Sequence, residues 1–188
     1  MRLTDNTQRY GLISILFHWV MAVLIIGLFL LGDFMVGLDY YHPWYLQAPD
    51  LHRSLGIVTA VLLLCRWLWR RFNPLPRILG SAWEQTLARQ VHGFFYILIT
   101  GVVISGYLIS TADGQGIEVF SWFELPALFT GPDNQEDIAG LVHEWLAWIL
   151  MALILLHSAA ALKHHFIDAD RTLLSMLQPG GDTLNKED

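Results

Sequence analysis

The chain has 188 residues, of which 54% are hydrophobic and only 15% are charged. A soluble domain carries about a quarter of its residues as charged side chains, so this composition argues against a soluble protein. The single cysteine, Cys65, excludes a disulfide framework and any cysteine-ligated metal or iron–sulfur site.

The apolar residues gather in four blocks of about 20 residues or more, the length that a helix needs to cross a bilayer. We therefore predict an all-α integral membrane protein, a four-helix bundle that forms a single membrane domain over residues 1–188. In chain order, the expected transmembrane helices span about 12–36, 51–71, 88–110 and 140–166, and a polar tail follows over 167–188.

Positive charge is distributed unevenly between the loops. The N-terminus, the second loop with its flanks and the tail hold ten of the eleven Lys and Arg residues, and the exception is Arg53. By the positive-inside rule, we expect both termini, and so the tail, to be cytoplasmic. The third loop, 111–139, has six carboxylates and no Lys or Arg, and we expect it on the outer side.

Histidines at two depths are the most informative residues within the expected spans. His143 and His157 lie fourteen residues apart in the fourth span. At ~1.5 Å and ~100° per residue they are ~21 Å apart and within ~40° of the same face. His18 matches the depth of His157, and His52 matches that of His143, which predicts two facing pairs. Ionisable groups at such depths are costly, which favours a functional role.

Two imidazoles that face each other across a bundle can bind a metal from both sides. With no cysteine ligand available, and with small residues such as Gly56 and Ser158–Ala161 leaving flat space, haem fits best. Two axial ligands leave no position for oxygen, so outer-sphere electron transfer is the expected chemistry. Arg53 lies beside His52 in the pair expected near the outer side, and Arg66 lies near the depth of the His18–His157 pair, expected near the cytoplasmic side. Either arginine could neutralise a haem propionate or snorkel to the interface.

The remaining membrane histidines are open to a simpler interpretation. His92 is expected near the cytoplasmic interface, where a half-solvated histidine needs no special role. His164 and His165, beside Lys163, are typical of interface anchors, although His164 continues the face of His157 seven residues further on.

Three short patterns stand out in the first, second and fourth spans: His18–Trp19, His52-x-x-x-Gly56, and His143–Glu144 followed by His157. Together with four spans and this length, they resemble the bacterial cytochrome b561 family from Tyr10 to about Leu177. The resemblance implies an inner-membrane protein with two haem b groups, whose axial ligands are His18, His52, His143 and His157.

The resemblance also implies electron transfer between quinone and a donor or acceptor on the periplasmic side, with ubiquinone as the substrate. Some members are thought to oxidise superoxide and reduce ubiquinone, with a histidine matching His164 near the quinone. The acidic third loop would repel an anion such as superoxide, which argues against that activity here.

Other roles remain open at this stage. The chain could act alone or as the cytochrome subunit of a larger redox complex. A small metal or proton transporter is the rival class, but such a path needs polar residues at intermediate depths, and between His143 and His157 only Glu144 has an ionisable side chain. Apart from membrane lipid, the expected partners are quinone and a periplasmic redox protein, and nothing indicates nucleic-acid binding.

Overall fold

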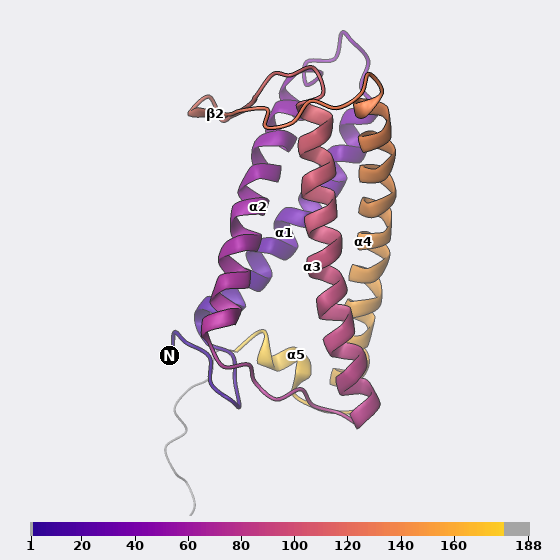
Figure 1. Cartoon of the computed structure of the whole chain (residues 1–188). Helices are drawn as coiled ribbons and strands as arrows, with labels where there is room; N and C mark the ends of the chain where they lie inside the picture. Colours follow the sequence, from indigo (N-terminus) through magenta and orange to yellow (C-terminus); the bar gives the residue numbers. More distant parts are fainter. Residues whose placement is uncertain (1, 179–188) are drawn as a thin grey trace, which may run out of the picture.

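Four long helices run side by side through the molecule (Figure 1). The computed structural model describes residues 2–178. Its long helices are α1 (Leu12–Val36), α2 (Gln47–Phe72), α3 (Ala82–Ser110) and α4 (Gln135–Phe166). All four are long and apolar enough to cross a membrane, which confirms the predicted all-α bundle.

Three of the helices begin before the expected spans, at Gln47, Ala82 and Gln135. The start of α3 has a clear local cause, because the Glu84 carboxylate accepts a hydrogen bond from the Ser81 backbone N–H at 2.8 Å. This capping arrangement nucleates a polar turn ahead of the apolar run. Where the membrane boundary falls within each helix stays a prediction.

The side chains on the outside of the bundle are apolar. Ile97 and Leu155, for example, are each 67% exposed. Such continuous apolar surface is unfavourable in water, whereas acyl chains cover it in a bilayer. Inside, Met21, Ile99 and Leu150 form a buried cluster that joins α1, α3 and α4. Leu150 lies halfway along α4 between His143 and His157, so this apolar layer separates the two depths.

The N-terminal segment, the α2–α3 connection and the short helix α5 (Thr172–Ser175) lie at the same end of the bundle (Figure 1). Asp5 is buried and accepts a hydrogen bond from the Ser14 hydroxyl at 2.6 Å, which holds the start of α1. The Trp19 indole donates to the Met176 carbonyl at 2.7 Å and fastens the C-terminal segment to α1. Residues 179–188 of the expected tail lie outside the described residues.

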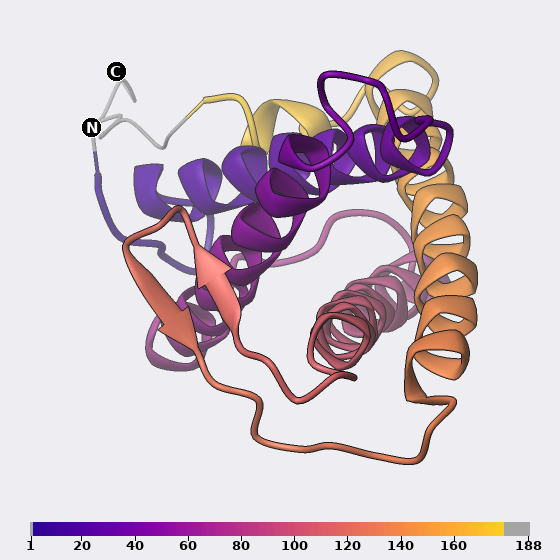
Figure 2. The same cartoon turned by 90° about the horizontal axis from the view of Figure 1, so that it is seen from above.

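A small β-hairpin lies at the opposite end, where the sequence indicated only a loop. Its strands, β1 (Ile117–Val119) and β2 (Phe123–Leu125), pair antiparallel beside the N-terminal part of α2 (Figure 2). The Phe120 backbone N–H at the turn donates to the buried Ser54 hydroxyl of α2 at 3.1 Å. This bond helps to seat the hairpin on the bundle.

Candidate functional site

The structure brings His52 of α2 and His143 of α4 together. Their ring centroids are 6.1 Å apart and their planes are inclined by 71°. Imidazole nitrogens bind transition metals at about 2 Å, so two rings on opposite sides of one metal have centroids about 6 Å apart. The observed spacing therefore suits two axial ligands of a single iron.

Hydrogen bonds orient the His143 ring. Its Nδ1 lies 3.0 Å from the Val102 carbonyl oxygen and 3.2 Å from the Ser105 hydroxyl oxygen. A carbonyl oxygen only accepts, so the short contact assigns the proton to Nδ1 and leaves a lone pair on Nε2. Metal-binding histidines typically donate their second ring N–H in this way.

His52 turns one edge of its ring toward α1. Its Nδ1 is buried and has no partner within strict hydrogen-bond geometry among residues 2–178. The ring packs against α1 at Gly32, where an added Cβ would lie 3.4 Å from the His52 Cε1. The Nδ1 edge of the ring thus faces the backbone of α1 near Leu28, which leaves Nε2 as the nitrogen available to a metal.

Three histidines gather at the second depth. The ring centroids of His18 in α1 and His157 in α4 are 6.4 Å apart, with planes inclined by 59°. His92 of α3 also lies near His157, with a centroid separation of 5.5 Å, and Phe95 packs on the same ring at 5.3 Å. The His18–His157 pair therefore has a third imidazole beside it.

His92 lies deeper in the bundle than a third span beginning at residue 88 predicted, because α3 begins at Ala82. With α3 starting at Ala82, His92 lies ~15 Å along the helix at ~1.5 Å per residue, level with the bundle interior. The signal was present in the sequence: Ser81 and Glu84 have the spacing of a capping box, which marks the true start of the helix.

The two arginines proposed for propionates differ in their surroundings. Arg53 forms an ion pair with Asp50 on the surface. Arg66 is partly buried, its Nη1 lies 3.9 Å from the Met21 sulfur, and it forms no ion pair with a carboxylate within residues 2–178. Arg66 is therefore the better placed of the two to balance an anionic group inside the bundle.

Carboxylates hold the His164 ring at the end of α4. Its Nδ1 is 2.8 Å from the Asp170 carboxylate and 3.0 Å from that of Asp168, so Nδ1 is the donor. Partial burial alone would raise the pKa of Asp170, but hydrogen bonds from Thr172 and His164 outweigh it and lower the pKa below its usual value. Asp170 therefore stays a carboxylate at neutral pH.

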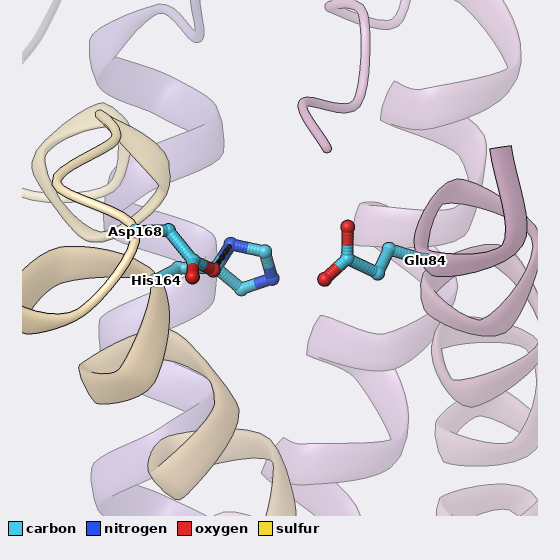
Figure 3. Close-up of side chains that lie close together, drawn as sticks. All are labelled: Glu84, His164 and Asp168. Carbon is cyan, nitrogen blue, oxygen red and sulfur yellow. Dashed lines mark ion pairs between the residues drawn. The ribbon is translucent and has the colours of Figure 1, made fainter. Parts of the chain in front are cut away.

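A cluster of polar side chains connects α3 and α4 at this end. Glu84, His164 and Asp168 have ligand atoms within 4.8 Å of one another, with Glu84 facing the other two (Figure 3). The Lys163 ammonium bonds to Glu84 at 3.2 Å and to Asp168 at 2.6 Å. Because the Lys163 ammonium already bridges both carboxylates, we interpret the cluster as an ion-pair network, not as a metal site.

Comparison with known proteins agrees with this geometry. A family model for prokaryotic cytochrome b561 matches residues 9–179. Cytochrome b561 homolog 2 of Escherichia coli (strain K12) is 48% identical over 179 residues, which cover 94% of this chain and 95% of the relative. The chain belongs to the prokaryotic cytochrome b561 family.

More distant members of the cytochrome b561 family align over a similar length. Cytochrome b561 homolog 1 of Escherichia coli (strain K12) is 27% identical over 176 residues, covering 90% of this chain and 97% of the relative. A probable superoxide oxidase CybB of Yersinia pestis is 29% identical over 176 residues, covering 90% and 96%.

Membership confirms the resemblance seen in the sequence. This cytochrome b561 family member is a multi-pass bacterial membrane protein of electron transport, and the family implies binding of b-type haem. The residues fit that group. Two histidine pairs have the spacing of axial ligands, and the hydrogen bond at His143 leaves Nε2 free to bind iron.

Proposed function

We propose that this cytochrome carries electrons across the bacterial inner membrane by means of two b-type haems, one at each histidine pair. The supporting observation is the juxtaposition of two imidazole pairs, with centroids 6.4 Å and 6.1 Å apart, at two depths of one bundle. His18 and His157 would bind one iron, and His52 and His143 the other. The haems, when bound, would supply reversible one-electron transfer.

The protein would position and insulate these groups. α4 supplies one ligand to each iron, so a single rigid helix sets the separation between them. The layer of Met21, Ile99 and Leu150 excludes water between the two depths. Arg66 would offset the negative charge of a propionate near the inner pair.

Ubiquinone is the proposed electron-exchange partner at the end of the bundle that holds His164. Quinone chemistry moves protons with electrons, so its site needs a group that exchanges protons. The carboxylates of Asp168 and Asp170 fix His164 with its proton on Nδ1, which leaves Nε2 available to accept the proton of a quinol hydroxyl. A redox protein on the periplasmic side would complete the path.

The haem assignment predicts separable losses in two single mutants. His143→Ala should remove the haem at the His52 pair, and His157→Ala the one at the His18 pair, because each change leaves the other pair intact. Haem content per protein and the reduced α-band spectrum measure this, with His42→Ala as a control outside both pairs. Two normal low-spin haems in either ligand mutant, or a colourless wild-type protein, would refute the assignment.

The quinone assignment predicts a different pattern for His164→Ala. This change removes the proposed proton-exchanging imidazole but leaves both histidine pairs, so haem content should stay normal while haem reduction by ubiquinol slows at least tenfold. Phe166→Ala, at an exposed apolar position two residues further on, is the control. A quinol reaction of unchanged rate and affinity would place the site elsewhere.

Two alternatives have weaker support. Superoxide oxidation is suggested by the name of the Yersinia pestis relative, but the six carboxylates of 111–139 would repel an anionic substrate. A metal or proton transporter would need polar groups between the two depths, where the structure has the apolar layer of Met21, Ile99 and Leu150. Service as a subunit of a larger redox complex is compatible with the proposal.

A further inference from the structure

A cavity of about 740 Å³ opens at the end of the bundle where the α2–α3 connection lies. Four arginines from three consecutive segments line it. Arg70 and Arg71 come from the last turn of α2, Arg77 from the connection, and Arg89 from the first turns of α3. The cavity thus collects four positive charges from segments that fold back on one another.

Within residues 2–178, none of these arginines forms an ion pair with a carboxylate. The acidic groups at this end have other partners: Asp5 accepts from Ser14, and Glu84 accepts from Ser81 and Lys163. Four guanidinium groups around one cavity, uncompensated by that part of the chain, favour a bound anion. Arginine's planar fork suits the oxygens of a phosphate group in particular.

The rest of the lining combines hydrogen-bond donors with an apolar wall. Burial raises the pKa of Tyr10, and the opposing effect of the nearby Arg70 charge is smaller. The phenol is therefore neutral and can donate a hydrogen bond. Trp67 and Leu75 also line the cavity and are 53% and 48% exposed, which leaves apolar surface beside the charged end. A small inorganic anion has no apolar group that could pack against this wall.

We propose that this cavity binds the phosphate headgroup of an anionic phospholipid, with an acyl chain lying along the apolar wall beside Trp67. Basic pockets between transmembrane helices at the membrane boundary are suited to such headgroups. Snorkelling of side chains to the interface explains single arginines at helix ends. It does not explain why Arg77 of the connection lines the same cavity as Arg70 and Arg89. The cavity also borders His92, whose ring centroid lies 5.5 Å from that of His157, so haem content is measured together with lipid binding.

Phosphatidylglycerol is a suitable probe, titrated into the full-length haem-containing protein in phosphatidylcholine nanodiscs and in mixed micelles for native mass spectrometry. The test variant is Arg77→Gln/Arg89→Gln. Arg2→Gln/Arg171→Gln is the matched control. It removes the same charge from the N-terminal segment and the start of α5, which lie at the same end, and neither residue lines the cavity. At about 1 kcal/mol per arginine, phosphatidylglycerol affinity should fall about thirtyfold in the test variant.

The expected result is a selective loss of bound phosphatidylglycerol in the test variant, with normal haem content and with the control like wild type. An equal loss in the control would mean diffuse surface attraction and overturn the proposal. Loss of haem instead of lipid would assign the arginines to haem propionates. Competition by inorganic phosphate at the same concentration as the lipid would mean a soluble anion site, which also overturns the lipid assignment.

Discussion

At the scale of single residues, glycines determine how closely the helices approach the candidate ligands. Gly106 of α3 lies against His143, since an added Cβ would be 3.1 Å from the ring Cε1 and 3.3 Å from Nδ1. Gly32 of α1 has the same relation to His52 at a looser 3.4 Å. A side chain at either position would occupy space that the imidazole needs for its orientation.

Gly106→Ala should therefore disturb the haem that we propose at His143 and spare the one proposed at His157. The new methyl group pushes the ring by a few tenths of an ångström and weakens its hydrogen bond to Val102, a bond that contributes about 1 kcal/mol. A redox titration followed by the α band should show a shift in one of two midpoint potentials.

Gly140→Ala in α4 is the matched control, because nothing lies within 4 Å of its added Cβ. Both changes raise helix propensity, so any general effect of a stiffer helix appears in both variants. Equal shifts of both potentials, or none, in Gly106→Ala would contradict the predicted contact.

At the scale of elements, the hairpin β1–β2 illustrates a structure held by a helix distant in sequence. Phe120 and Ser121 at its turn have φ angles of 49° and 58°, in the left-handed region that glycine or asparagine usually occupies. Such a turn is locally unfavourable, and the contact with Ser54 of α2 contributes to holding it.

Ser54→Ala should consequently loosen the hairpin without unfolding α2. The Phe120 N–H loses its acceptor, which costs about 1–3 kcal/mol if no water replaces it. Amide hydrogen exchange over residues 117–125 should accelerate about tenfold or more. Thr59→Ala is the control, since this buried hydroxyl bonds only to Leu55 within its own helix. Comparable acceleration in the control, or none in Ser54→Ala, would remove Ser54 from this role.

At the scale of the whole molecule, the bundle has two chemically different ends, one rich in positive charge and one rich in negative charge. The N-terminal segment, the α2–α3 connection and α5 lie at one end, and the hairpin with its acidic loop lies at the other. The arginines that favour retention of the first end in the cytoplasm also line the cavity described above. One set of charges can thus serve topology and lipid contact together.

Reporter fusions test the resulting orientation. A fusion after Pro76 should report the cytoplasm and one after Asn134 the periplasm, because ten of the eleven Lys and Arg residues accompany the first end. Alkaline phosphatase and a cytoplasm-active fluorescent protein give opposite readouts at each site. The reverse pattern would exchange the inner and outer histidine pairs and the proposed quinone end.

The sequence alone was sufficient for features that depend on local composition and helical periodicity. Four apolar blocks predicted four membrane-capable helices, and the fourteen-residue spacing of His143 and His157 placed both on one face of α4. Since depth along each helix follows from position, the partners His18 and His52 could be proposed before any contact was known. The structure brings both pairs together.

Tertiary structure decided whatever depends on how separate helices meet. The approach of His92 to His157, the seating of the hairpin on Ser54 and the convergence of four arginines on one cavity all join segments that no local pattern connects. Hydrophobicity and helical period describe one segment at a time. Contacts between segments depend instead on interhelical packing, helix starts and turns, which are fixed only when the whole bundle has formed.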